Sequence, residues 1–139
     1  YALPENGQDI LKDGTDIVVY VTGSILEEVY LAAEYLEKDG ISVKLVNITM
    51  LKPFDKKSIM KTAEKISKIF TVEEHNIYGG LGSIVAETLS YSGVPANVFP
   101  VGIVDRFASG YGTHRSVRKA NGLDAESIYK KIKGKLTDE

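Results

Sequence analysis

The densest group of ionisable side chains in the sequence is Glu73-Glu74-His75, which directly follows a buried apolar run. Two carboxylates beside an imidazole suit general acid–base chemistry, and such groups also bind metal ions. Side chains alternate between the faces of a strand, so Glu74 would diverge from Glu73 and His75. Metal sites usually need more ligands, and His114 is the only other histidine. We therefore interpret this cluster as a polar strand end that contacts another domain, and we predict no metal site and no catalytic residue in this chain.

A second candidate for chemistry is the glycine-rich run at residues 79–83, Gly-Gly-Leu-Gly-Ser, which opens a predicted helix. Glycines at a helix start let an anion approach the free backbone amides. The run lacks the Gly-Lys-Ser/Thr ending of a phosphate-binding loop and does not follow the dinucleotide-binding fingerprint closely. We therefore interpret it as a tight strand-to-helix turn. Gly79 and Gly80 are retained as candidate residues of a crevice or an interdomain contact.

A third candidate is the basic stretch from Gly110 to Lys119, in which Thr113 is suited to cap a helix. Arginine side chains and helix-start amides both bind phosphate, which makes Thr113, His114 and Arg115 a candidate anion site. The alternative, which we favour, is a solvated basic surface. The sequence contains no serine nucleophile elbow, and its histidines and aspartates lack the spacing of a catalytic triad.

These segments must be positioned by a scaffold, and the chain alternates predicted strands and helices from residue 16 to about residue 101. Unbroken β-prone apolar runs are typical of strands that are buried on both faces, as in a parallel sheet. The predicted strands are 16–22, 43–48, 69–72 and 97–101. Pro100 cannot donate to a sheet ladder, so the last strand is predicted to lie at an edge. A short additional strand is predicted at Gln8–Lys12.

Three helices are predicted between these strands, each with an apolar stripe at helical spacing. Ser24 is predicted to cap the first helix, and Glu28 is placed off its apolar stripe. Gly40 ends this helix in a left-handed conformation. Asp55 is predicted to cap the second helix, and Gly93 to close the third. Further helices are predicted at 113–120 and 124–135.

Strands that alternate with helices in this way predict an open α/β sheet with helices on both faces. Ligands of such sheets bind beyond the carboxyl ends of the strands, at the point where the strand order reverses. If the order reverses around strand 16–22, this crevice is lined by Gly23, Ser24 and the cluster at residues 73–75. We predict that Gly23, Ser24, Glu73 and His75 share one crevice.

Composition limits the class of protein further. The chain has 139 residues, of which 43% are hydrophobic and 26% charged, the balance of one globular domain. A net charge of −2 gives no general attraction to nucleic acid or to anionic membranes. No apolar run approaches the roughly 20 residues of a membrane span. The absence of cysteine fits a cytoplasmic location. The first residue, Tyr1, indicates a chain cut from something longer.

Several short motifs together carry a resemblance that single residues do not. The motifs follow one order along nearly the whole chain: Gly14-Thr15-Asp16, Gly23-Ser24, Lys52-Pro53-Phe54-Asp55, Thr71-Val72-Glu73-Glu74-His75, Gly79-Gly80-Leu81-Gly82-Ser83, Gly102-Ile103-Val104-Asp105-Arg106-Phe107 and Gly122-Leu123-Asp124. In this combination the sequence resembles the C-terminal domain of the transketolase family. Relatives in that family are 1-deoxyxylulose-5-phosphate synthase and the β subunit of 2-oxoacid dehydrogenases.

The resemblance implies a fold: a three-layer α/β/α domain around a five-stranded mixed sheet. The first short strand of the family runs antiparallel to the others, which corresponds to Gln8–Lys12 here. The last strand lies at an edge, in agreement with Pro100. The segment 107–122 is about one residue longer than the family pattern, and its Ser116-Val117-Arg118 offers one apolar residue where two are usual. The subfamily therefore stays open.

The resemblance also implies a function. Transketolases transfer a two-carbon ketol unit between sugar phosphates in pentose phosphate metabolism. They use thiamine diphosphate and magnesium, which a diphosphate-binding domain holds through a Gly-Asp-Gly motif that ends in paired asparagines. A pyrimidine-binding domain supplies the glutamate that activates the thiazolium. This sequence contains neither motif, so we expect no cofactor in this chain.

We therefore expect residues 1–139 to form one domain, as a fragment or a separate subunit of a homodimeric enzyme. Its expected partners are the diphosphate-binding and pyrimidine-binding domains, and alone it should be inactive. Two alternatives remain. The chain is the C-terminal domain of the synthase or of a dehydrogenase β subunit, or it is a free-standing binding or regulatory module.

Overall fold

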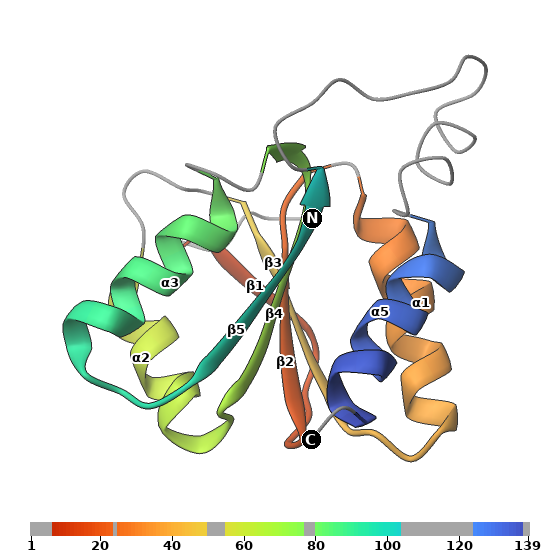
Figure 1. The fold of residues 1–139 in the computed structure, drawn as a ribbon, viewed down its shortest axis with the longest axis horizontal. Coiled ribbons are helices and arrows are strands. Elements are labelled where there is room, and N and C mark those ends of the chain that lie inside the picture. Colours follow the sequence, from red (N-terminus) through yellow and green to blue (C-terminus); the bar gives the residue numbers. More distant parts are fainter. Residues whose placement is uncertain (1–6, 24, 50–54, 77–79, 104–123, 138–139) are drawn as a thin grey trace.

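A five-stranded sheet between two layers of helices forms the centre of the molecule (Figure 1). The computed structural model describes residues 7–23, 25–49, 55–76, 80–103 and 124–137, with backbone alone at 74–76, 102 and 103. The strands are β1 (Gln8–Lys12), β2 (Ile17–Val21), β3 (Val43–Ile48), β4 (Lys68–Asn76) and β5 (Asn97–Ile103). Their order in the sheet is β1-β3-β2-β4-β5. Strand β1 is antiparallel to β3 and all other pairs are parallel, which confirms the expected mixed sheet.

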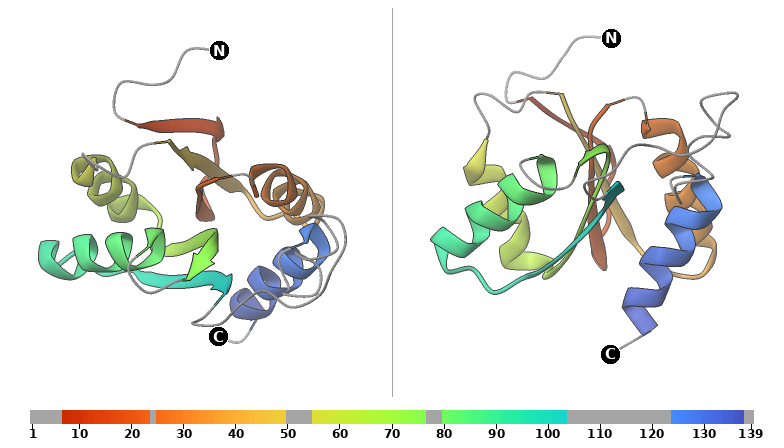
Figure 2. Two further views of the ribbon diagram at one scale, coloured as in Figure 1. Left: turned by 90° about the horizontal axis from the view of Figure 1, so that it is seen from above. Right: turned by 45° about the horizontal axis from the view of Figure 1, so that its top comes forward.

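The helices divide between the two faces of the sheet according to the direction of each crossover (Figure 2). They are α1 (Leu26–Lys38), α2 (Lys56–Lys65), α3 (Leu81–Ser92) and α5 (Ala125–Thr137). The chain moves one way from β2 to β3 and the opposite way from β3 to β4, and both crossovers are right-handed in such sheets. Helices α1 and α5 therefore share one apolar cluster, and α2 and α3 share the cluster on the other face. The strand order reverses at β2, which is the condition under which the sequence analysis placed the crevice.

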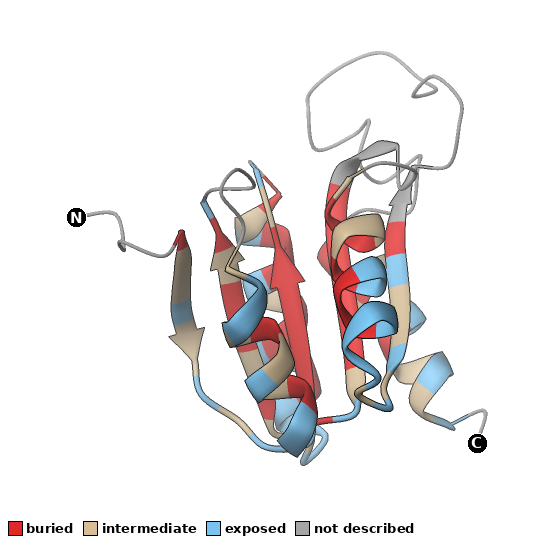
Figure 3. Ribbon diagram, turned by 90° about the vertical axis from the view of Figure 1, so that its left-hand side faces the viewer, coloured by how far each residue is buried: buried red, intermediate tan, exposed pale blue. Residues whose placement is uncertain are grey.

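Strand β2 is the most deeply buried element, because all five of its residues are inaccessible to solvent. Val19 and Val21 pack in the cluster with α1 and α5, whereas Val18 and Tyr20 pack in the cluster with α2 and α3. Figure 3 shows the contrast between these buried central strands and the exposed outer sides of the helices. The unbroken apolar sequence of β2 is explained by burial on both faces.

Most local signals in the sequence act as predicted. The Asp55 carboxylate accepts a hydrogen bond from the backbone amide of Ser58 at 3.2 Å and so caps α2. Gly40 and Gly93 end α1 and α3 with φ of 85° and 72°, in the left-handed region. Ser24, the predicted cap of α1, lies outside the described residues. The structure places Ile25 at that N-cap, without a side-chain hydrogen bond.

Strand β4 differs from the sequence-based expectation, because it continues through Asn76 rather than ending at Val72. The extension pairs with β5, where Asn76 lies opposite Ile103 after an irregularity in register. Pro100 lies in β5 at the edge of the sheet, as predicted. The last helix is confirmed as α5, and the predicted helix at 113–120 lies outside the described residues.

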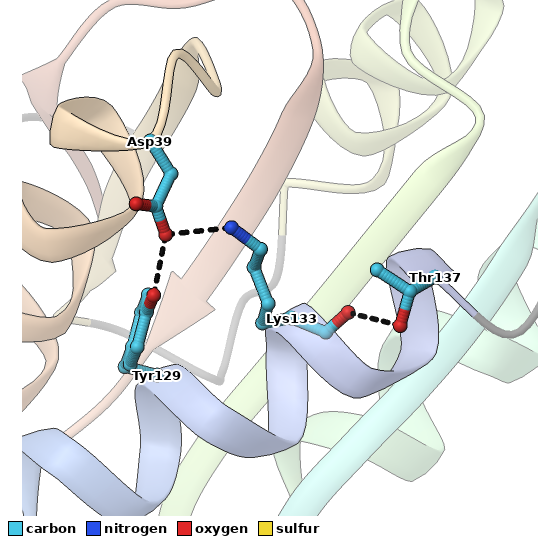
Figure 4. Close-up of polar contacts among 4 residues, drawn as sticks. All are labelled: Asp39, Tyr129, Lys133 and Thr137. Carbon is cyan, nitrogen blue, oxygen red and sulfur yellow. Dashed lines mark hydrogen bonds and ion pairs between the residues drawn. The ribbon is translucent and has the colours of Figure 1, made fainter.

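A polar contact fastens α5 to the end of α1 (Figure 4). The Asp39 carboxylate accepts hydrogen bonds from the Lys133 ammonium group, at 2.7 Å, and from the Tyr129 hydroxyl. Lys133 first, and Tyr129 second, hold the pKa of Asp39 below its ordinary value. A carboxylate whose pKa is depressed by folding stabilises the fold above its unfolded pKa. This contact therefore weakens as the pH falls through the folded pKa of Asp39.

Two glycines give opposite predictions for substitution by alanine. A Cβ at Gly14 would lie 2.3 Å from the backbone carbonyl carbon of Val43, whereas a Cβ at Gly134, within α5, would meet nothing within 4 Å. We expect Gly14→Ala to lower the free energy of unfolding by about 1–3 kcal/mol, as overpacking does. Gly134→Ala should raise it by up to about 1 kcal/mol through helix propensity. Urea unfolding of both variants checks this, and equal stability of the two would contradict it.

Tyr20 generates a prediction for alkaline pH. Burial raises the pKa of Tyr20 to about 12, and the nearby Thr62 side chain opposes the rise only in part. Its hydroxyl makes no hydrogen bond of normal geometry, so burial is the dominant cause. The unfolded chain releases this proton near pH 10 and the folded chain near pH 12, so stability falls between these values. The largest loss is about 3 kcal/mol.

Tyr20→Phe should therefore lose less stability than the native chain as the pH rises from 9 to 12. Tyr91→Phe is the matched control, because Tyr91 is 90% exposed. Chemical denaturation across this pH range measures both. If the free energy of unfolding changed with pH in the same way for Tyr20→Phe and for the native chain, the raised pKa of Tyr20 would be contradicted.

Candidate functional site

The predicted site lies at the carboxyl edge of the sheet, where β2 ends at Val21 beside Val72 of the parallel strand β4, which continues to Asn76. The Thr22 amide donates to the Val72 carbonyl at 3.4 Å, so the residues that follow both strands stay on the same edge. Gly23 follows β2 with a φ of 86° and is exposed. Glu73 occupies the neighbouring stretch of β4. These two predicted residues therefore share one edge of the sheet.

Glu73 is the one described side chain of the 73–75 cluster, and it is 2% exposed. Its Oε1 accepts a hydrogen bond from the Leu81 amide at 3.0 Å, and its Oε2 accepts one from the Gly82 amide at 2.9 Å. Both amides belong to the first turn of α3 and have no partner within the helix. The positive end of a helix also favours a negative charge. Glu73 is thus a two-oxygen cap of α3, and both of its oxygens are occupied.

The glycine run brings α3 against the sheet. A Cβ at Gly82 would lie 3.0 Å from the Thr71 hydroxyl and 3.2 Å from the Pro100 Cβ, so glycine permits the close approach. Gly80 is the N-cap of α3, with extended backbone and no side-chain hydrogen bond. This geometry fits the interpretation of a tight strand-to-helix turn. The amides at this helix start bind the chain's own carboxylate.

The remaining predicted site residues are placed only in part. Glu74 and His75 belong to β4 by their backbone, which the sequence analysis took as the strand end. Ser24, Gly79 and the candidate anion site at Thr113, His114 and Arg115 lie outside the described residues. The shared crevice and the anion site therefore stay predictions.

Glu28 is a functional polar residue that sequence reasoning missed. It was placed off the apolar stripe of α1, yet it is 5% exposed. Its Oε2 accepts a hydrogen bond from the Ala125 amide at 2.8 Å, so it binds the start of α5. Glu28 lies three residues after Ile25 and four before Ala32, which puts it on the buried face of α1. This spacing was the signal in the sequence that indicated its burial.

Two cavities lie away from Glu73 and the glycine run, and Glu28 lines one of them. A cavity of about 410 Å³ at the amino edge of the sheet is lined by Lys65, Lys68 and Lys133, among others. Lys65 stands in the last turn of α2, where the negative helix end favours cations. A groove of about 460 Å³ between β1 and α1 is lined by Leu11, Leu26, Glu27, Glu28, Tyr30 and Leu31.

Two further properties concern metals and membranes. Over the ranges that the structure describes, no three acidic or histidine side chains gather closely enough to bind a metal ion. Among the helices in those ranges, none combines the length and the apolar character that a membrane span requires.

Comparison with known proteins agrees with this geometry. The family model described as "Transketolase, C-terminal domain" matches residues 7–128. The chain therefore belongs to the transketolase C-terminal domain family.

Individual relatives include subunits and larger enzymes. One of the subunits of the apulose-4-phosphate transketolase from Actinobacillus succinogenes is 37% identical over 86% of this chain and 39% of its own length. A putative transketolase C-terminal section from Methanocaldococcus jannaschii is 37% identical over 94% of this chain and 40% of its own length. The 1-deoxy-D-xylulose-5-phosphate synthase of Syntrophotalea carbinolica is 35% identical over 91% of this chain and 20% of its own length.

Solved structures show the same fold. A split gene transketolase, described as an inactive β4 tetramer, matches with a TM-score of 0.85 and 34% identity over 96% of this chain and 43% of its own. A transketolase from Pichia stipitis matches with a TM-score of 0.66 at 21% identity, over 93% of this chain and 18% of its own, which supports the fold alone. The chain thus spans about two fifths of the subunit relatives.

Removal of one Glu73 acceptor tests its structural role. In Glu73→Gln the side chain keeps one accepting oxygen and directs an NH₂ group at an amide that needs an acceptor. We expect the free energy of unfolding to fall by about 1.5–3 kcal/mol, the range for hydrogen bonds to charged groups. The control is Glu87→Gln on the exposed side of α3, which should change it by less than about 0.5 kcal/mol. Equal urea midpoints for the two variants would refute the capping role.

Proposed function

We propose that this chain is the C-terminal domain of a thiamine-diphosphate-dependent transketolase, which transfers a two-carbon ketol unit between sugar phosphates. The observation that carries the proposal is the match to the split gene transketolase, at a TM-score of 0.85 over 96% of the chain. The two shorter transketolase relatives at 37% identity support the same assignment. Pentose phosphate metabolism and a cytoplasmic location remain predictions of the sequence analysis.

We assign the domain a structural and interdomain role rather than a catalytic one. Asp55, Glu73 and Glu28 would be the natural oxygen ligands for magnesium, yet each has oxygens bound to helix-start amides. Magnesium requires near-octahedral oxygen coordination, and the described residues hold no such cluster. Among the residues that the structure describes, these three carboxylates therefore offer no ready ligand set for magnesium. The cofactor belongs to other parts of the enzyme in this proposal.

The proposed partners are the diphosphate-binding and pyrimidine-binding domains, in the same chain or in a partner subunit. The support is the share that this chain covers of the apulose-4-phosphate transketolase subunit, the synthase and the split gene transketolase, which is 39%, 20% and 43%. The remaining length of those relatives accommodates further domains. The description of the split gene relative as an inactive β4 tetramer supports inactivity of this type of chain by itself. Homodimerisation of the full enzyme stays part of the proposal.

One alternative to the transketolase is supported by a specific observation. In this alternative the chain is the C-terminal domain of 1-deoxyxylulose-5-phosphate synthase. Several synthases match at 34% to 35% identity over 89% to 91% of the chain. These values are close to those of the transketolase subunits. The alternatives of a dehydrogenase β subunit and of a free-standing regulatory module stay predictions of the sequence analysis.

The function is tested first on the 139-residue chain alone. Calorimetry with thiamine diphosphate and magnesium should show no binding heat, and a coupled ketol-transfer assay should stay at background. Addition of the diphosphate-binding and pyrimidine-binding domains of its own enzyme should produce both signals. Turnover by residues 1–139 alone would overturn the structural role. Formation of 1-deoxyxylulose 5-phosphate without ketol transfer would favour the synthase.

A further inference from the structure

Helix α5 directs its basic side chains to two sides. Lys133 turns towards α1, where its ammonium group lies 2.7 Å from the Asp39 carboxylate (Figure 4). The other three lysines of α5 line a cavity of about 250 Å³ between this helix and the edge strand β5, which lie side by side in Figure 2. We name it the α5/β5 cavity. The residues that line it are Phe70, Phe99, Pro100, Val101, Lys130, Lys131, Gly134 and Lys135.

The α5/β5 cavity is strongly basic, because three lysines and no acidic side chain are among the described residues that line it. Lys130 also pairs with Glu126, one turn away on the helix, at 3.1 Å. Both side chains of this pair are largely exposed, so the pair is weak and leaves the cavity positive. The carboxyl end of a helix carries about half a negative charge, which does not offset three lysines. A ligand that suits this cavity therefore carries negative charge.

One wall of the cavity is aromatic. The Phe99 ring stacks on the buried Phe70 ring, with centroids 5.1 Å apart, and Phe99 itself is half-buried. The Lys135 ammonium group lies 6.0 Å from the centroid of the Phe99 ring, at the outer limit of a cation–π contact. A flat ring packed on Phe99 would therefore place a negatively charged substituent within reach of Lys135.

Gly134 is a residue of α5 that the packing of the domain does not require. Glycine within a helix is less favourable than alanine. At Gly82 a Cβ would lie 3.0 Å from the Thr71 hydroxyl, whereas at Gly134 it would meet nothing within 4 Å. No neighbouring group thus excludes a larger residue at this position. Because Gly134 lines the cavity, a side chain here would occupy the space that a ligand needs.

The edge position of β5 argues against an added strand as the occupant. Pro100 has no amide to donate to a further strand, and prolines at sheet edges oppose such pairing. The volume of about 250 Å³ lies near the lower limit of small-molecule sites, which is about 300 Å³. The occupant that fits this cavity is therefore a small molecule.

We propose that the α5/β5 cavity binds a small organic phosphate that contains a planar ring. The ring packs on Phe99, and the phosphate lies between Lys131 and Lys135. These lysines are one turn apart on α5, where like charges are mutually unfavourable, and an anion between them removes this repulsion. A phosphate monoester carries about two negative charges at neutral pH, which matches two lysines. The cavity and α3 lie on opposite faces of the sheet, so this site is separate from Glu73 and the glycine run.

The first test is a titration of the 139-residue chain at low salt, followed by the amide signals in NMR spectra. The probes are phenyl phosphate and inorganic phosphate. Phenyl phosphate should bind at least about fivefold more tightly, because its ring is buried on Phe99. The amide signals of Phe99, Gly134 and Lys135 should shift most. Equal affinities for the two probes, or shifts centred elsewhere, would overturn the proposal, and neither result depends on a ketol-transfer assay.

Two variants test the site itself. In Gly134→Leu the new side chain fills the cavity and should weaken phenyl phosphate binding by about tenfold or more, since close-packed space excludes a ligand. The same variant should unfold at a higher urea concentration, because leucine favours a helix over glycine. Lys135→Gln should weaken binding by about tenfold through the loss of a charge-assisted hydrogen bond. The matched control is Lys57→Gln on α2, an exposed lysine away from the cavity. Native affinity in Gly134→Leu or in Lys135→Gln would refute the site.

A third probe, AMP, distinguishes two sources of the ring. Tighter binding of AMP than of phenyl phosphate identifies a mononucleotide as the ligand, and the reverse order identifies a phosphate with a single ring. Either order supports the proposed chemistry, provided that Gly134→Leu weakens the binding of the tighter probe. Unchanged binding of that probe to Gly134→Leu would overturn the proposal.

Discussion

The binding of buried carboxylates to helix-start amides is the interaction on which the architecture depends. Glu73 receives two amides of α3, and Glu28 receives one of α5. A buried carboxylate without partners is strongly unfavourable, and so are free amides at a buried helix start. The hydrogen bonds between them therefore remove the free-energy cost of burying the carboxylate and of burying the amides. The positions of α3 and α5 against the sheet follow from where these two carboxylates stand.

This use of acidic groups fits the structural role that we propose for the domain. Asp55, Glu73 and Glu28 each bind the first turn of a helix, over sequence separations of 3, 8 and 97 residues. A carboxylate that holds backbone amides has fewer lone pairs for a metal ion or a substrate proton. Of the three, only Glu73 belongs to the ionisable cluster of the sequence, and it serves as an anchor. Under the proposed function, a domain built in this way relies on its neighbours for catalysis.

The sequence predicts the local parts of this fold well and the non-local parts poorly. The apolar run of β2, the cap at Asp55 and the edge position of Pro100 each follow from the residue type and its neighbours. The spacing of Glu28 indicates its burial, but its partner Ala125 is 97 residues away and no local pattern identifies that partner. The extension of β4 to Asn76 was missed for the same reason, since it depends on pairing with Ile103. At the candidate site, Glu73 was selected because it is polar and clustered in the sequence, whereas its helix-capping role needed the position of Gly82.

The bond between Glu28 and Ala125 has a consequence for the order of folding. Closing a loop of 97 residues is entropically unfavourable, and the local crossovers of the sheet involve much shorter loops. Strands β2, β3 and β4 with their helices can therefore assemble early, while Glu28 remains hydrated on the uncovered side of α1. Docking of α5 then dehydrates this carboxylate and supplies its amide in one step, so the final helix joins the domain as a late, cooperative event.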